Sequence, residues 1–181
     1  GIGALYNAVI KDIKKIDILV NNAGISAWSS VNETDIEVYK KVMNMNYMSV
    51  VSLTKSVLPD MIKRRSGQIV TNTSLSGKFG SKKRSVYAAA KHALHGFIDS
   101  LRAEVHEHNI KVNTIAPGIF DTPLMKMAPD KIRDPLISST QFPHRFGEPN
   151  EFAQLAMHIV ENTYLNGETI RLDSGMRMQP R

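Results

Sequence analysis

The sequence contains no cysteine, which excludes a disulfide framework, a thiolate metal site and a cysteine nucleophile. It also lacks low-complexity tracts, internal repeats and any apolar run near the roughly 18 residues of a membrane-spanning helix. No signal-peptide pattern is visible. The 181 residues, of which 42% are hydrophobic and 22% charged, suffice for one domain with its own core.

Positive charge is in excess, with a formal net charge of +6 and a pI near 9.6. Basic residues gather in the runs 63–65 and 82–84. A solvated surface is the favoured interpretation, and attraction of an anionic substrate or cofactor phosphate is the alternative. Nucleic acid is not an expected partner, because no aromatic interleaving or reader motif accompanies the charges. His92 and His95 lack an acidic partner at metal-ligand spacing, so no metal site is expected.

Hydrophobic patterning alternates between strands and helices along the chain. Strands are predicted at 16–20, 68–73, 111–116 and 168–172, and helices at 5–14, 35–58, 87–106 and 149–161. The run Ile16–Val20 is nearly all apolar, which is typical of a strand buried on both faces of a parallel sheet. Pro59 is expected to end the helix that begins at Asp35. The order predicts an α/β fold, a Rossmann-like doubly wound parallel sheet with right-handed crossovers.

Residues 119–147 hold four prolines and little periodicity. We expect an irregular segment with a short helix, acting as a substrate loop or lid. The apolar residues of this segment either line a hydrophobic pocket or pack against other apolar side chains. They are Ile119, Phe120, Leu124, Met125, Met127 and Phe142. Ligands of parallel sheets bind beyond the carboxyl ends of the strands, which here are 21–24, 74–77, 117–122 and 173–175.

Tyr87 and Lys91 lie four residues apart at the start of a predicted helix, so they share one face. A free phenol has a pKa near 10, and a neighbouring ammonium favours its ionised form. The pair can therefore exchange a proton with a carbonyl or alcohol oxygen. The alternative is a tyrosine and a lysine that merely lie one turn apart.

Two further polar residues complete a candidate site. Ser74 follows a predicted strand, and its hydroxyl either binds a substrate oxygen or caps its own turn, with Thr73 and Ser76 as close competitors. Asn46 interrupts an apolar helical stripe. A buried amide must be satisfied, either by bonds to backbone or by anchoring a water that relays protons to Lys91.

With these residues the sequence resembles the short-chain dehydrogenases/reductases over essentially its whole length. Asn46, Ser74, Tyr87 and Lys91 match that family's catalytic tetrad in order and spacing. Three other segments match its motifs: Asn21-Asn22-Ala23-Gly24, Pro117-Gly118 with Thr122, and Arg145–Pro149 followed by Leu165–Glu168.

The resemblance implies an NAD(P)-dependent oxidoreductase that interconverts a secondary alcohol and a ketone. Ser74 would orient the substrate oxygen, Tyr87 would transfer the proton, and Lys91 would lower the Tyr87 pKa and bind the nicotinamide ribose. Asn46 would hold the relay water. NAD or NADP would contact Asn22, Ala23, Gly24, Tyr87, Lys91, Pro117, Gly118 and Thr122. The resemblance also implies a homodimer or homotetramer that pairs the helices 35–58 and 87–106.

One departure concerns the N-terminal part of the family pattern. The Asn-Asn-Ala-Gly motif comes at residue 21, whereas about 60–70 further residues, two βαβ units, would precede it in the family. The glycine-rich pyrophosphate turn would lie there, and Gly1-Ile2-Gly3 is at most a remnant of it. We therefore expect residues 1–181 to form a single but partial catalytic domain. The alternative is a truly shortened chain with an exposed sheet edge, acting as an inactive binding or scaffold protein.

Two branches of the family are resembled in different parts of the chain. Residues 43–105 resemble the dehydrogenase/reductase member 7 branch, which implies apolar carbonyl substrates and an endoplasmic-reticulum setting. Residues after about 113 resemble the 3-hydroxyacyl-CoA and hydroxysteroid dehydrogenase branch, which implies acyl-CoA or steroid substrates, NAD and a mitochondrial setting. The second branch covers the substrate loop, so it weighs more for the substrate class.

Overall fold

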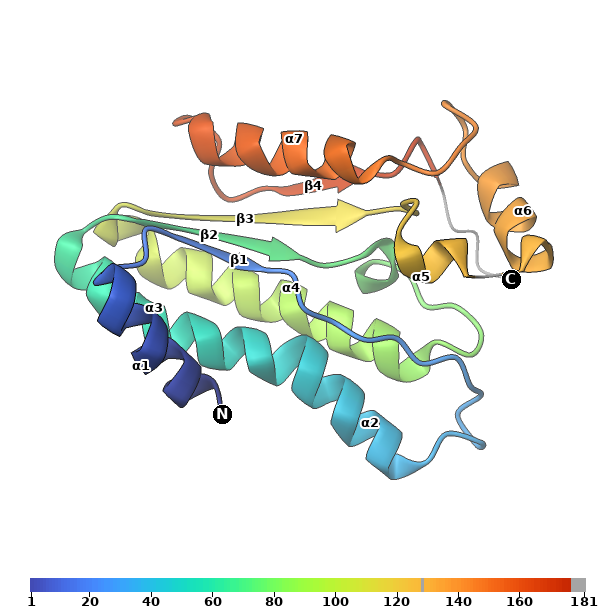
Figure 1. Cartoon of the computed structure of the whole chain (residues 1–181), viewed down its shortest axis with the longest axis horizontal. Helices are drawn as coiled ribbons and strands as arrows, with labels where there is room; N and C mark the ends of the chain where they lie inside the picture. Colours follow the sequence, from blue (N-terminus) through green and yellow to red (C-terminus); the bar gives the residue numbers. More distant parts are fainter. Residues whose placement is uncertain (128, 177–181) are drawn as a thin grey trace.

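A computed structural model describes residues 1–127 and 129–176, with only the backbone of Leu124, so the expectation for that side chain lies outside the described residues. Its centre is one sheet of four parallel strands (Figure 1): β1 (Ile18–Asn21), β2 (Gly67–Asn72), β3 (Ile110–Pro117) and β4 (Thr169–Leu172). The strands lie side by side in chain order. The predicted α/β fold with a parallel sheet is confirmed.

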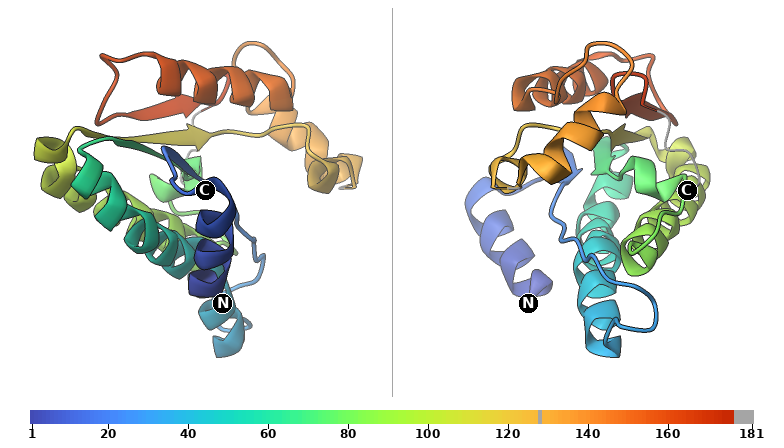
Figure 2. Two further views of the ribbon diagram at one scale, coloured as in Figure 1. Left: turned by 60° about the vertical axis from the view of Figure 1, so that its left-hand side comes forward. Right: turned by 90° about the vertical axis from the view of Figure 1, so that its right-hand side faces the viewer.

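Helices cover both faces of the sheet (Figure 2). On one face lie α1 (Ile2–Ile13), α3 (Ser49–Arg64) and α4 (Ser85–Val105), and on the other lies α7 (Pro149–Glu161). Alternate side chains of β2 serve the two layers, because Ile69 packs with the α3 and α4 core and Val70 packs with the α7 core. Apolar residues of α4, namely Ile98, Leu101 and Val105, form much of the core between the sheet and the helices α3 and α4.

The last crossover differs from the prediction. The first two connections run over one face, through α3 and α4, while the third returns over the opposite face through α7. Since the strand order steps in the same direction each time, the hand of the third crossover is opposite to that of the first two. This connection is an exception to the right-handed preference, and it is long, since it contains α5 (Pro123–Lys126) and α6 (Asp130–Ser138) before α7.

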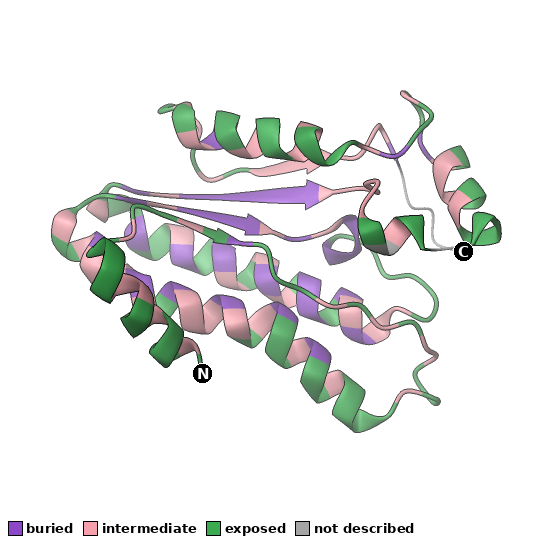
Figure 3. Cartoon of the chain, in the orientation of Figure 1, coloured by how far each residue is buried: buried purple, intermediate pink, exposed green. Residues whose placement is uncertain are grey.

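The expectation that the first strand is buried on both faces is wrong. β1 is the edge strand, and Figure 3 shows it largely exposed beside the buried β2 and β3. Leu19 packs into the α3 and α4 core, but Ile18 and Val20 are 41% and 49% exposed. Their face is the one that α7 covers over β2 to β4, and α7 does not pack on β1. An apolar run thus indicates a strand without showing that both faces are covered.

The predicted helix 35–58 is in fact three segments: α2 (Ile36–Met43), a π-helical turn η1 (Asn44–Met48) and α3. The helix also continues through Pro59 to Arg64. Proline removes one backbone hydrogen bond there, at a cost of about 3 kcal/mol. Val57 and Met61, 2% and 0% exposed, flank Pro59, and their burial in the core outweighs that cost.

The N-terminal helix is confirmed but begins earlier than predicted. Gly3 lies in its first turn, at the start of α1. Leu5 and Ile13 are apolar but each 56% exposed, whereas Tyr6 packs against the core of α3 and α4. Helix α1 therefore contacts the core with the face that carries Tyr6, next to the face that carries Leu5 and Ile13.

Residues 119–147 contain two short helices, α5 and α6, in place of the single one expected. Ile119 and Phe120 line a small cavity of about 110 Å³. Met127 and Phe142 are 82% and 84% exposed, so in this structure they neither line a pocket nor pack in a core.

Candidate active site

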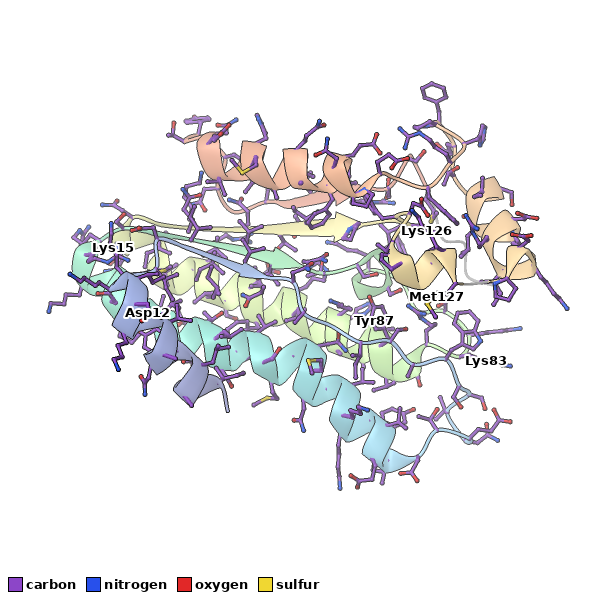
Figure 4. The ribbon with its side chains drawn as sticks, in the orientation of Figure 1. Asp12, Lys15, Lys83, Tyr87, Lys126 and Met127 are labelled. Carbon is purple, nitrogen blue, oxygen red and sulfur yellow. The ribbon has the colours of Figure 1, made fainter. Side chains whose placement is uncertain are left out.

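Tyr87 is the third residue of α4 and is half-buried at the carboxyl-end side of the sheet. Figure 4 places it at the same end of the molecule as Lys83 and Met127, far from Asp12 and Lys15. The start of α4 is fixed by a 2.8 Å hydrogen bond between the Tyr39 and Ser85 hydroxyls. Among the described residues nothing hydrogen-bonds to the Tyr87 hydroxyl, which leaves it available to a ligand.

Lys91 lies one helical turn after Tyr87 and is 4% exposed. Its Nζ donates a 3.1 Å hydrogen bond to the backbone carbonyl of Asn72 at the end of β2, and it lies 5.7 Å from the centre of the Tyr87 ring. Burial lowers the pKa of Lys91 to about 8. At neutral pH the group is therefore still mostly protonated, and one of its three donors is used by Asn72.

Ser74 follows β2 and begins the 3₁₀ turn η2 (Leu75–Gly77). Its Oγ accepts a 3.1 Å hydrogen bond from the backbone N–H of Ser76, which is the capping role, and its own proton remains free to donate. The two competing hydroxyls are buried, and that of Thr73 donates to the Ile115 carbonyl at 3.2 Å. Of the three, Ser74 alone is half-buried and so accessible.

Asn46 lies in the π-helical turn and is 1% exposed. Its side chain accepts a hydrogen bond from the Ile25 N–H at 3.1 Å and donates to the carbonyls of Ile25 at 2.8 Å and Val42 at 3.0 Å. Both amide protons are thus used by backbone, the first of the two predicted roles. The water-relay role stays a proposal, resting on the second lone pair of Oδ1.

Asn21, the last residue of β1, and Asn22, which follows it, tie the ends of β1 and β2 together. Asn21 Nδ2 donates to Thr71 Oγ1 at 3.3 Å, and Asn72 Nδ2 donates to Asn22 Oδ1 at 2.7 Å. The Oδ1 atoms of Asn21 and Asn72 are buried without a hydrogen-bond partner among the described residues. Such orphaned acceptors beside Lys91 suit a polar ligand at this strand end.

Pro117 is the last residue of β3, and Gly118 follows where β3 meets β4. Gly118 N–H donates to the Leu172 carbonyl at 2.9 Å, and a Cβ at this position would lie 2.8 Å from Asp173 Cα. Glycine is therefore required by the close approach of two backbones. The Thr122 hydroxyl accepts from Met125 N–H at 3.4 Å and caps α5, so it already has a structural partner.

The residues present fit the nicotinamide-ribose half of NAD(P). Ala23 and Gly24 are exposed, and a Cβ on Gly24 would lie 2.6 Å from Asn46 Oδ1 and 3.8 Å from Lys91 Nζ. The missing Cβ thus lets Asn46 pack against Gly24, and it leaves the Lys91 ammonium close to this exposed residue. Ala23 also lines an open groove of about 790 Å³ between α1 and the α2–α3 helix, floored by Met45, Met48 and Leu53.

Sequence reasoning missed two residues beside Tyr87. The Arg84 guanidinium carbon lies 4.4 Å from the centre of the Tyr87 ring and 5.5 Å from that of Trp28. The spacing could have indicated Arg84, because it precedes Tyr87 by three residues and such residues are neighbours on a helix. That signal is weak, since helix α4 begins only at Ser85. No spacing could have predicted Trp28, which arrives from a distant loop.

Neither a metal cluster nor a membrane span is found in the part of the chain that the structure describes. No group of three or more His, Cys, Asp or Glu side chains there is arranged to hold a metal ion. None of the described helices combines the length and apolar character that crossing a membrane requires.

Comparisons with known proteins agree with this geometry. The family model described as short chain dehydrogenase matches residues 1–133. A bovine 3-hydroxyacyl-CoA dehydrogenase type-2 is 34% identical over 178 residues, covering 92% of this chain and 68% of that protein. The mouse dehydrogenase/reductase SDR family member 7B is 44% identical over 123 residues, covering 68% of this chain but only 38% of that protein.

The solved structures give the same result. The crystal structure of 3-oxoacyl-[acyl-carrier protein] reductase from Brucella melitensis superimposes with a TM-score of 0.89 at 31% identity. The match covers 98% of this chain and 69% of that one. The resemblance to two different branches, noted from the sequence, is confirmed.

Proposed function

The chain belongs to the short-chain dehydrogenase family of oxidoreductases, and on that premise we propose that it interconverts a secondary alcohol and a ketone through Tyr87. The observation that carries the proposal is the placement of the buried Lys91 ammonium one turn behind a phenol whose hydroxyl has no partner among the described residues. A phenol hydroxyl carries one proton and two lone pairs, so with no partner among the described residues it can both give a proton to and take one from a substrate oxygen.

The roles proposed for the other polar groups follow from the hydrogen-bond donors that other described residues leave unused. Ser74 donates its hydroxyl proton to the substrate oxygen and so orients it towards Tyr87. Lys91 keeps two N–H donors, close to the exposed Gly24, for the ribose hydroxyls. When NAD(P) is bound, its nicotinamide ring gives or takes the hydride, which no side chain can supply. Pro117, Gly118 and Thr122, at the end of β3, border the nicotinamide side.

The substrate proposal follows the relatives. The names of the bovine and Brucella proteins both refer to acyl chains that are hydroxylated or oxidised at carbon 3. We therefore place an acyl thioester first and apolar ketones such as steroids second, with NAD ahead of NADP and mitochondria ahead of the endoplasmic reticulum. The assembly proposed is a dimer or tetramer through the α2–α3 helix and α4, which sedimentation velocity measures directly.

The test is Tyr87→Phe, assayed with acetoacetyl-CoA and a steroid ketone, each with NADH and NADPH. Removing one oxygen should abolish turnover, while the midpoint of thermal unfolding should stay unchanged because no described residue bonds to that oxygen. Tyr164→Phe is the matched control, since Tyr164 is 99% exposed. Near-normal turnover by Tyr87→Phe would refute the role of Tyr87. Cofactor binding by the unaltered chain without turnover would instead indicate the binding or scaffold protein.

A further inference from the structure

The Arg84 side chain lies against two aromatic rings. The centres of the Trp28 and Tyr87 rings are 5.5 Å and 4.4 Å from its guanidinium carbon, and the arginine is half-buried. The loop that carries Trp28 is tied to this place by a 3.0 Å hydrogen bond from Ser29 N–H to the Lys83 carbonyl. The arrangement is therefore built from two distant segments and is not a chance contact within one loop.

The guanidinium has no anionic partner among the described residues. Burial lowers the pKa of Arg84, and an arginine stays charged in proteins. The Tyr87 ring lies against the guanidinium, and no hydrogen bond from its side-chain donors to another described residue is found. An arginine with free edge donors in a partly dehydrated position is suited to bind an oxyanion through paired hydrogen bonds.

The surroundings favour an anion as well. Residues 78–84 include Lys78, Lys82 and Lys83, all exposed, and no acidic residue. Figure 4 places Lys83 at the same end of the molecule as Tyr87. Glu33 is an acidic neighbour of Lys83, but the three lysines outnumber it, and their net positive charge attracts anions over about 10 Å at moderate salt.

We infer that Arg84 binds a carboxylate of the substrate, and we therefore place free 3-oxo or 3-hydroxy acids ahead of the acyl thioesters that the names of the relatives suggest. The inference rests on the proposed function, since it takes Tyr87 as the residue facing the ketone. Because Arg84 stacks on the Tyr87 ring, its anion lies only a few bonds from the reacting carbonyl. The phosphates of coenzyme A are separated from a thioester carbonyl by the long pantetheine arm, so they do not meet this requirement. The carboxylate of a 3-oxo acid does.

The test uses Trp28, the only tryptophan of the chain, as an internal reporter. The whole chain is titrated with acetoacetate and, separately, with its uncharged ethyl ester, while tryptophan emission is recorded. Acetoacetate should change the emission in a saturable way, and the ester should do so only at concentrations roughly tenfold or more higher, the size of one lost charged hydrogen-bond pair.

Three variants give the controls. Arg84→Gln keeps a planar group against the rings but has no charge, and it should weaken acetoacetate binding by roughly tenfold or more. Arg84→Lys keeps the charge without the paired donors and should weaken it by less. Lys15→Ala removes an exposed charge at the opposite end of the molecule and should leave the affinity within about twofold. Equal binding of acid and ester, or unchanged binding by Arg84→Gln, would overturn the inference.

Binding and turnover separate the two proposals. If acetoacetate leaves the tryptophan emission unchanged in a chain that reduces ketones through Tyr87, the role of Arg84 is refuted and the role of Tyr87 stands. If acetoacetate binding is saturable and depends on Arg84, but turnover survives Tyr87→Phe, the role of Tyr87 is refuted and the role of Arg84 stands.

Discussion

Asn46 binds both backbone polar groups of Ile25, accepting from its N–H at 3.1 Å and donating to its carbonyl at 2.8 Å. Where the chain leaves β1, a single side-chain amide thus makes the pair of hydrogen bonds that a neighbouring strand would make to the backbone of a residue. The π-helical turn carries Asn46 in a buried position, and the preceding Gly24 has no Cβ that would collide with its oxygen. This contact links the cofactor side of the site to the helix that precedes β2.

Replacing Asn46 by alanine should lower both stability and activity. Two backbone groups of Ile25 lose their partner, and each buried unsatisfied group costs about 1–3 kcal/mol. Urea unfolding measures the loss, and Asn44→Ala is the control because Asn44 is exposed in the same turn. Equal unfolding midpoints for the two variants would show that Asn46 does not hold Ile25.

Two glycines should respond to alanine with opposite signs. Gly96 lies inside α4 with open space around it, so Gly96→Ala should raise the free energy of unfolding by up to about 1 kcal/mol. Gly118→Ala would place a Cβ 2.9 Å or less from Asp173 atoms, including its backbone, and should cost about 1–3 kcal/mol. Chemical unfolding of both variants checks the signs, and a stabilised Gly118→Ala would contradict the close packing of β3 against β4.

The buried Lys91 should make stability rise with pH in alkali. Burial lowers its pKa from 10.5 to about 8, so between these values the unfolded chain binds more protons than the folded one. At about 1.4 kcal/mol per pH unit, this interval adds about 3 kcal/mol to the free energy of unfolding by pH 10.5. Below pH 8 both states are protonated and the cost of the buried charge is fully present.

Lys91→Met should remove this rise. Urea unfolding at pH 7, 9 and 10.5 measures it as a difference from the unaltered chain, so that other titrating groups cancel. The exposed Lys55→Met is the control and should keep the rise. A slope that persists in Lys91→Met would mean that another group is responsible.

The open face of β1 predicts a contrast between neighbouring residues. Ile18→Thr should change stability by less than about 0.5 kcal/mol, because Ile18 is 41% exposed on the part of the sheet face that α7 does not reach. Leu19→Ala should cost at least about 1 kcal/mol, since Leu19 packs into the core of α3 and α4. A large loss in Ile18→Thr would show that this face is covered in solution, for instance by a second copy.

Much of this protein could be predicted from the sequence because its signals are local. The spacing of Tyr87 and Lys91, the strand-end position of Ser74 and the helical period of α4 depend only on neighbours along the chain. These features survive any change in how the layers are stacked. The helix 149–161 was predicted with its observed bounds for the same reason: Pro149 begins it and its apolar period runs to its end.

Tertiary structure decided what depends on residues far apart in the chain. Whether Ile18 and Val20 are covered depends on the reach of α7, and whether a helix tolerates Pro59 depends on the core that receives Val57 and Met61. The same holds for Arg84, whose environment is completed by Trp28 from a loop more than fifty residues away. Burial and charge environment are properties of the packed molecule, because they are set by what lies across a contact and not by what comes next in the chain.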